Sequence, residues 1–240
     1  MRKIVLLIFE GDSDSFALYD WLYKIGNAFD VQFEVLDGDP FSNYDNQGKS
    51  SKNIVGAIVA KFKKDRKIRD EDILAVFQLT DTDGVFIPAG NIIFDRTSVE
   101  QKKYMTDKIV TKNERSQKLI AQRNEHKRNH LIALTRTKMI RKAVYEIYYF
   151  SRNLDAIIHN SADISYSDKI TAAEAFSDSF ASETEFEQFF NNKEFAVAGD
   201  YKETWDFITQ GCNSLNRYSN FHLLFASLRV LLEEHRRESQ

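Results

Sequence analysis

Three residue types are scarce in this chain of 240 residues, which has one cysteine, two prolines and nine glycines. Cys212 alone can form neither an internal disulfide nor a cysteine zinc cluster, which fits a reducing cytosol. Few prolines favour long, uninterrupted helices and strands. No apolar run approaches the roughly 18 residues of a membrane span, and the run over residues 2–9 is too short for a secretory signal. We therefore expect a cytoplasmic protein without a membrane partner.

Charge is unevenly distributed, although the net charge is only −3. Residues 102–142 contain 13 Lys and Arg against 3 Asp and Glu, whereas both flanking parts of the chain are acidic. A basic segment of this kind predicts a surface for phosphate backbones. The alternative is a solvated helix face, or an arm that pairs with acidic parts of its own chain or of a partner subunit.

Two apolar runs end in acidic residues. Residues 73–79 are followed by Asp81 and Asp83, and residues 3–9 are followed by Glu10. If the runs are neighbouring parallel strands, all three carboxylates emerge at one end of the sheet, where α/β proteins bind ligands. Carboxylate oxygens suit Mg²⁺. The alternative is that these acids only form turns and helix caps, with Asp12 as a cap.

The alternation of strand and helix predicts a parallel sheet flanked by helices. We expect a helix over 13–25 with Gly26 as its C-cap, and a helix over 52–66 with Ser50 or Ser51 as its N-cap. Residues 84–94 are expected to form a loop or short edge strand. The expected strands of the sheet span residues 3–9, 31–36, 73–79 and 144–150.

The remaining chain is predicted to be mainly helical. We expect an α/β domain over 1–160, with a basic helical insertion at about 99–142, and a helical C-terminal region over 161–240. Helices are expected there over residues 170–180, 183–190, 201–209 and 220–237. This region should pack on the α/β core through its Phe side chains. Alternatively, an exposed apolar face would mediate homodimer or partner contact, through Phe221, Leu224, Phe225 and Leu228.

Three segments together resemble the TOPRIM family. The sequence FEGDSD at 9–14, a β-α-β-α pattern and then DTD at 81–83 match a family in which Glu closes the first strand and Asp-x-Asp the third. Residues 149–159, YFSRNLDAIIH, resemble the strand-to-helix segment of the RloB-like and OLD-type members found in bacterial anti-phage loci. The resemblance covers residues 1 to about 160. The chain departs from the pattern at Asp155, where Glu is more usual, and in its long basic segment.

The resemblance implies a TOPRIM-like, Rossmann-like sheet and a metal-dependent nuclease acting on DNA or RNA, including tRNA, in phage defence. Mg²⁺ or Mn²⁺ would be the cofactor, and some OLD-type relatives have an ATPase partner. Glu10, Asp81 and Asp83 would be the catalytic residues and metal ligands, with Asp14 and Asp155 as candidates for a second metal. His159 is a further catalytic candidate. The basic segment would hold nucleic acid by charge, through Lys127, Arg128, Arg136, Lys138 and Arg141.

Two other functions fit parts of the sequence. DTDGVF at 81–86 is also similar to the nucleophile motif of haloacid-dehalogenase-like phosphatases, with Asp81 phosphorylated and Asp200 and Asp206 as the late acidic motif. That motif belongs on the first strand, whereas here a β-α-β-α unit precedes it. A TOPRIM-like protein that binds nucleic acid or a partner without cleaving is the other alternative. Glu10 separates the three, because only the nuclease requires it.

Overall fold

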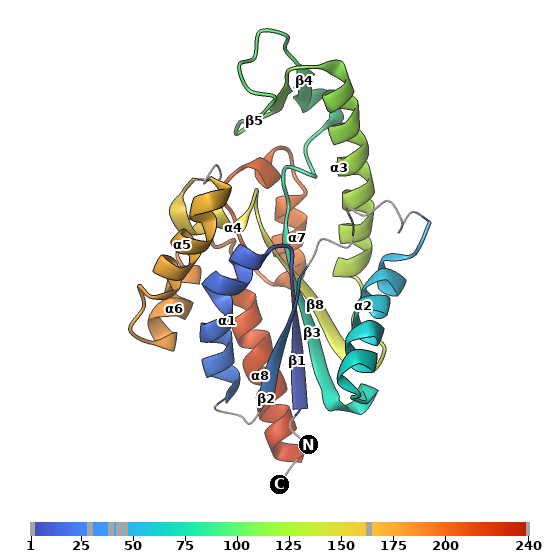
Figure 1. The fold of residues 1–240 in the computed structure, drawn as a ribbon, viewed down its shortest axis with the longest axis vertical. Helices are drawn as coiled ribbons and strands as arrows, with labels where there is room; N and C mark the ends of the chain where they lie inside the picture. The colour runs from blue at the N-terminus through green and yellow to red at the C-terminus, as the bar shows by residue number, and fades with distance from the viewer. Residues whose placement is uncertain (1–2, 28–30, 38–40, 42–47, 162–164, 239–240) are drawn as a thin grey trace.

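A five-stranded sheet with helices on both faces forms the centre of the molecule (Figure 1). The computed structural model describes residues 3–27, 31–37, 41, 48–161 and 165–238. The sheet has the order β2-β1-β3-β8-β7. Its strands are β1 (Lys3–Phe9), β2 (Val31–Asp37), β3 (Ile73–Asp81), β7 (Met139–Ile140) and β8 (Ala143–Phe150). The helices are α1 (Asp12–Asn27), α2 (Ser51–Arg66), α3 (Glu114–Thr135), α4 (Leu154–His159), α5 (Tyr166–Ser177), α6 (Glu183–Phe190), α7 (Tyr201–Ile208) and α8 (His222–Glu238).

The four predicted strands are confirmed, and they run parallel to one another. The apolar runs of β1 and β3 are buried on both faces, as expected of strands covered by helices. β7 is a short antiparallel edge strand that the sequence did not predict. Ser50 caps α2 by accepting a hydrogen bond from Asn53 N–H, as predicted. The C-cap assigned to Gly26 is wrong, because Gly26 lies inside α1, with the ring of Phe33 packed against it.

Side chains that alternate along the strands build two cores. One lies between the sheet and helices α1, α5, α6 and α8, and includes Leu7, Phe77 and Phe150 of the strands. The other lies under α2, α3 and α7, and includes Leu6 and Tyr149. Figure 1 shows α1 and α2 on opposite sides of the strands.

Of the C-terminal helices, α5, α6 and α8 pack in the first of these cores, and α7 packs in the second. The phenylalanines of α5, α6 and α8 pack in the first core with strand residues, as predicted, and only Phe189 among them is partly exposed. Trp21 of α1 donates a hydrogen bond to the Ser177 carbonyl at 2.9 Å. The alternative of an exposed apolar face is wrong. The side chains assigned to that face, Phe221, Leu224, Phe225 and Leu228, are at most 2% exposed.

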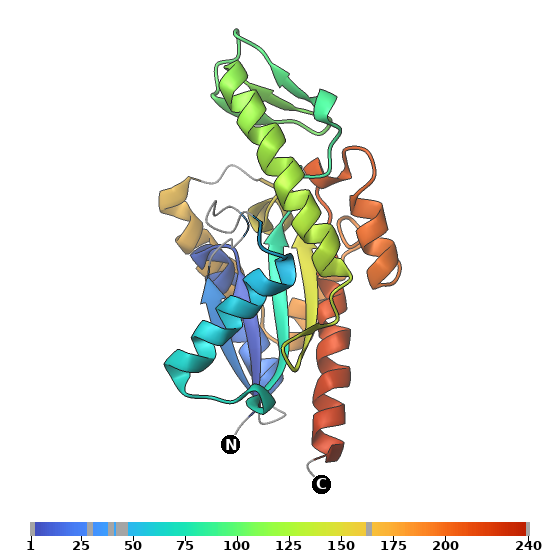
Figure 2. The ribbon, with the colours of Figure 1, turned by 90° about the vertical axis from the view of Figure 1, so that its right-hand side faces the viewer.

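The segment over residues 99–142 is only partly helical. Its first part forms β5 (Lys102–Tyr104) and β6 (Ile109–Thr111), which join β4 (Ile92–Phe94) in a second sheet of order β4-β6-β5. Three consecutive β-branched residues in β6 explain the strand. Together with the start of α3, this sheet projects beyond the carboxyl ends of the central strands (Figures 1 and 2). Among the described residues, no helix is long and apolar enough to cross a membrane.

Candidate active site

The parallel strands bring Glu10 and Asp81 to the same edge of the central sheet. β1 and β3 are neighbours, with Ile8 opposite Gln78, so the residue after β1 lies beside the end of β3. The hydroxyl group of Thr80 donates a hydrogen bond to the Glu10 carboxylate. The two acids are therefore at one end of the sheet, as the sequence predicts.

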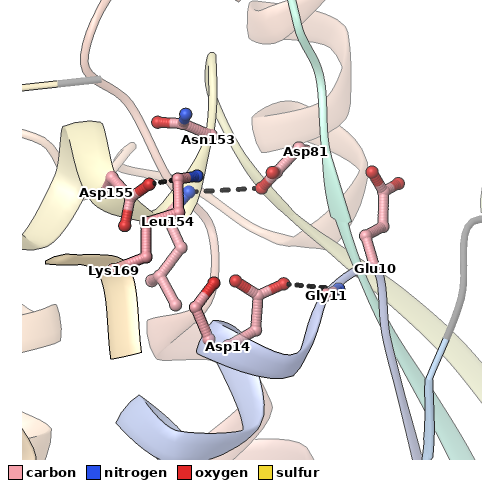
Figure 3. A pocket seen from close by; sticks show the side chains of 9 residues that line it. Glu10, Gly11, Asp14, Asp81, Asn153, Leu154, Asp155 and Lys169 are labelled. Carbon is pink, nitrogen blue, oxygen red and sulfur yellow. Dashed lines mark hydrogen bonds and ion pairs between the residues drawn. The ribbon is translucent and has the colours of Figure 1, made fainter. Parts of the chain in front are cut away.

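A cavity of about 220 Å³ opens at this edge (Figure 3). It is wide enough for several water molecules, each of which takes roughly 30 Å³ in the liquid. In Figure 3, Asp14 lies below Asp81, with Asp155 and Lys169 on one side and Glu10 on the other. The lining residues are Glu10, Gly11, Ser13, Asp14, Asp81, Asn153, Leu154, Asp155 and Lys169.

The surroundings of Asp81 disfavour its charged form. Burial is the largest cause, and the negative charges of Asp14, Glu10 and Asp83 add to it, so the pKa of Asp81 lies well above its usual value. Lys127 acts in the opposite direction without offsetting these effects. A carboxylate crowded by other carboxylates gains more than an ordinary one from a nearby cation.

Two lysines neutralise part of the negative charge. The Nζ atom of Lys127, on α3, is buried and lies 2.9 and 3.0 Å from the two carboxylate oxygens of Glu10. Lys169, on α5, lies 2.7 Å from an Asp155 oxygen. Burial acts to lower the pKa of Lys169, but the hydrogen bond and charge of Asp155, together with the charges of Asp81 and Asp14, outweigh it, and the pKa is raised. Four lining carboxylates against these two ammonium groups leave two negative charges when all are ionised.

The segment after β8 completes the pocket. Asn153 caps α4 by accepting a hydrogen bond from Ala156 N–H at 2.9 Å. This fixes Leu154, whose N–H donates to Asp81 Oδ1 at 3.2 Å. Asp155 follows on the same turn and faces Lys169. Residues 149–159 thus contribute three lining residues, Asn153, Leu154 and Asp155.

Asp83 is not among the lining residues, contrary to the expectation that it would join Asp81. β3 ends at Asp81, and Asp83 adopts a left-handed backbone conformation with φ of 49°. Its carboxylate lies 3.8 Å from Arg123 Nη1, and Arg123 also donates to the Asp83 carbonyl at 3.1 Å. The turn therefore directs Asp83 toward Arg123 of α3, whereas Asp14 lines the cavity.

The five basic residues predicted to contact nucleic acid do not form one exposed surface. Lys127 is 3% exposed and engaged with Glu10. Arg128 donates hydrogen bonds to the carbonyl groups of Val85 and Ile87 at 2.9 and 3.0 Å. Burial therefore contradicts the prediction of a surface contact for Lys127, whereas Arg128 is half-buried with its guanidinium group bound to the backbone.

The other three predicted contacts lie on the surface. Arg136 is exposed at the C-cap of α3. Lys138 lies over the ring of Tyr201, at 5.4 Å from its centroid. Arg141 pairs with Asp70 at 2.6 Å. Two of these three cations thus already have partners within the chain.

The remaining sequence candidates lie outside the pocket lining. His159 ends α4 and packs its ring against Phe176, and burial lowers its pKa. Asp200 caps α7, and Asp206 pairs with Lys202 on the surface of the same helix. Neither acid of the phosphatase-like late motif contributes to the cavity.

Lys169 is a lining residue that was not predicted from the sequence. It lies beyond the expected domain boundary, and only the packing of α5 against α1 brings it to the pocket, so no local signal marks it. Thr80 could have been found, because it directly precedes Asp81 at the end of the strand that neighbours β1. Comparisons with protein families, with curated proteins and with solved structures found no match to this chain.

Proposed function

We propose that this chain is a divalent-metal-dependent phosphodiesterase of the TOPRIM type that acts on nucleic acid. The observation that carries the proposal is the raised pKa of Asp81 in a cavity lined by three further carboxylates. Perturbed acids in a cleft at the carboxyl end of a parallel sheet are typical of catalytic sites. The FEGDSD and DTD motifs add the resemblance described above.

The donor set fits Mg²⁺ or Mn²⁺ in chemistry and charge. All candidate ligands are hard carboxylate oxygens, and the two excess negative charges equal the charge of one divalent ion. Asp14 and Asp81 would hold it, with Glu10 and Asp155 beside them. Among the described residues, no three acids, histidines or cysteines yet stand at mutual ligand distance. Binding would therefore need small shifts of side chains. The ion pairs of Lys127 with Glu10 and of Lys169 with Asp155 are the contacts that would open.

A bound ion would supply Lewis acidity toward a phosphate oxygen. The protein's own groups would do the rest. Glu10, held by Thr80 and Lys127, would serve as a ligand or as the general base that accepts a proton from the attacking water. Lys169 lines the cavity with about a third of its side chain exposed, so it would contact an anionic substrate there.

One observation favours a second candidate, a protein that binds nucleic acid or a partner without cleaving. Lys127 and Lys169 already pair with Glu10 and Asp155, so the pocket holds part of its counter-charge without a metal. In that case Lys127 and Lys169 would persist as permanent ion pairs, and Mg²⁺ would change neither stability nor nucleic-acid affinity.

A cleavage assay separates the two candidates. The purified protein is incubated with single- and double-stranded DNA and RNA, including tRNA, with Mg²⁺, Mn²⁺ or EDTA. We expect metal-dependent cleavage of at least one substrate. Asp81→Asn and Glu10→Gln should each reduce it by roughly 10²-fold or more, since loss of a positioned acid or base has effects of that order.

Asp83→Asn is the matched control, because Asp83 neighbours Asp81 in sequence but pairs with Arg123 outside the cavity. It should retain activity within a few-fold of wild type. Full activity in Asp81→Asn, or no cleavage of any substrate by wild type with either metal, would contradict the nuclease.

A further inference from the structure

Two histidines on α3 that do not line the carboxylate pocket lie against each other. His126 and His130 are one helical turn apart, so their side chains lie on the same face. Their Nε2 atoms are 3.1 Å apart, whereas their ring centroids are 4.4 Å apart. The two nitrogens are therefore turned toward each other.

The ring of His130 is fixed from two sides. Its Nδ1 atom lies 2.9 Å from the hydroxyl oxygen of Ser51, the first residue of α2. With the proton on Nδ1 donated to Ser51, the Nε2 atom carries the lone pair that a metal needs, and such second partners orient histidine ligands in metal sites. Phe41 stacks on the same ring, with centroids 5.0 Å apart. His130 is 8% exposed, and His126 is the more accessible of the two.

The separation of the nitrogens fits a shared metal ion. Imidazole nitrogens bind zinc at about 2.0–2.1 Å, so two of them at right to tetrahedral angles lie roughly 2.9–3.4 Å apart. We propose that His126 and His130 form a binding site for a late first-row divalent ion such as Zn²⁺, Ni²⁺ or Cu²⁺. Within the described parts of the chain, no third His, Cys, Asp or Glu joins them, so water completes the coordination.

Ligand type separates this site from the carboxylate pocket. Imidazole selects zinc, nickel and copper, whereas carboxylates and water suit magnesium and manganese. Lys127, which pairs with Glu10, lies on α3 between the two histidines in sequence. An ion on His126 and His130 would thus hold the turn of α3 that carries Lys127, and through Ser51 it would fasten this turn to α2.

Zinc titration of the metal-free protein at pH 7.5, followed by calorimetry and by thermal melting, tests the proposal. Wild type should bind one Zn²⁺ per chain at this site and melt at a higher temperature with it. In His126→Gln, the amide can still donate a hydrogen bond to His130 Nε2 but offers no imidazole. This variant should bind Zn²⁺ at least tenfold more weakly and lose the increase in melting temperature.

His235→Gln, on α8, is the matched control and should bind Zn²⁺ like wild type. Zn²⁺ should still raise the melting temperature of Asp81→Asn, and Mg²⁺ should still raise that of His126→Gln. Each variant therefore tests one of the two proposed sites independently of the other. Equal zinc affinity in wild type and His126→Gln would overturn the proposal. A zinc response that persists in His126→Gln and disappears in Asp81→Asn would overturn it as well, because zinc would then occupy the carboxylate pocket.

Discussion

Asp81→Asn should stabilise the metal-free protein at neutral pH. Asn keeps the Oδ1 atom that accepts a hydrogen bond from Leu154 N–H, and it removes the charge that burial and the neighbouring acids disfavour. Because the pKa of Asp81 is raised in the folded state, the folded protein retains a proton that the unfolded chain has already released. The stability due to this proton is fully present below about pH 4 and is lost as the pH rises through the folded pKa.

The size of the effect follows from this linkage. The free energy of unfolding of wild type falls by about 1.4 kcal/mol for each pH unit between the unfolded and the folded pKa of Asp81. The Asp81→Asn protein shows no such fall, because the Asn side chain is neutral. In a chain of this length, about 1 kcal/mol corresponds to roughly 2–4 °C in melting temperature. In EDTA at pH 8, Asp81→Asn should therefore melt at least about 2 °C above wild type. The difference should shrink as the pH falls toward 4.

Thermal melting between pH 4 and pH 9, with EDTA or with Mg²⁺, measures the effect. Asp83→Asn is the control: Asn tolerates the left-handed backbone at that position, and the loss of the Arg123 partner should offset the small relief of repulsion at Asp81. Mg²⁺ at a hundredfold over its dissociation constant should stabilise wild type by about 2.7 kcal/mol and leave Asp81→Asn nearly unchanged. A melting temperature of Asp81→Asn in EDTA at or below that of wild type at every pH, or an equal gain in Asp83→Asn, would refute a destabilising charge at Asp81.

Three further substitutions test other parts of the account. Gly26→Ala should lower stability by about 1–3 kcal/mol in urea unfolding, because a Cβ atom would lie 1.8 Å from a ring carbon of Phe33. An unchanged urea concentration at the unfolding midpoint would contradict this packing. Arg128→Met should lower stability by a similar amount, because two carbonyl groups lose the Arg128 donor. Its nucleic-acid affinity in fluorescence anisotropy should stay unchanged. A loss of affinity without a loss of stability would show that Arg128 contacts nucleic acid. Lys169→Met should tighten Mg²⁺ binding several-fold in calorimetry, because Asp155 loses its cation; weaker binding would indicate that Lys169 orders the ligands.

The sheet and its chemically active edge were predictable because both depend on local pattern. The apolar, β-branched runs of β1 and β3 specify buried strands, and parallel order then brings Glu10 and Asp81 together. The break in the helical pattern over residues 99–113 was not recognised. Short β-branched runs in a polar context, such as Ile109–Thr111, are weak signals until a partner strand covers them.

The rest of the site depends on geometry that residue spacing does not encode. The Asp-x-Asp motif after an apolar run suggested that Asp81 and Asp83 act together, but the left-handed turn at Asp83 redirects its carboxylate to Arg123. Likewise, a count of basic residues cannot separate Lys127, which is buried on Glu10, from an exposed neighbour such as Arg136. Long-range packing decides these roles.

The location of a bound metal ion tests the central claim most directly. Crystals grown with Mn²⁺ allow the ion to be identified by its anomalous scattering. The account predicts a peak within coordination distance of Asp14 and Asp81, which disappears in crystals of Asp81→Asn. Manganese bound instead between Asp83 and α3, or no ordered manganese in the cavity at millimolar concentration, would contradict it.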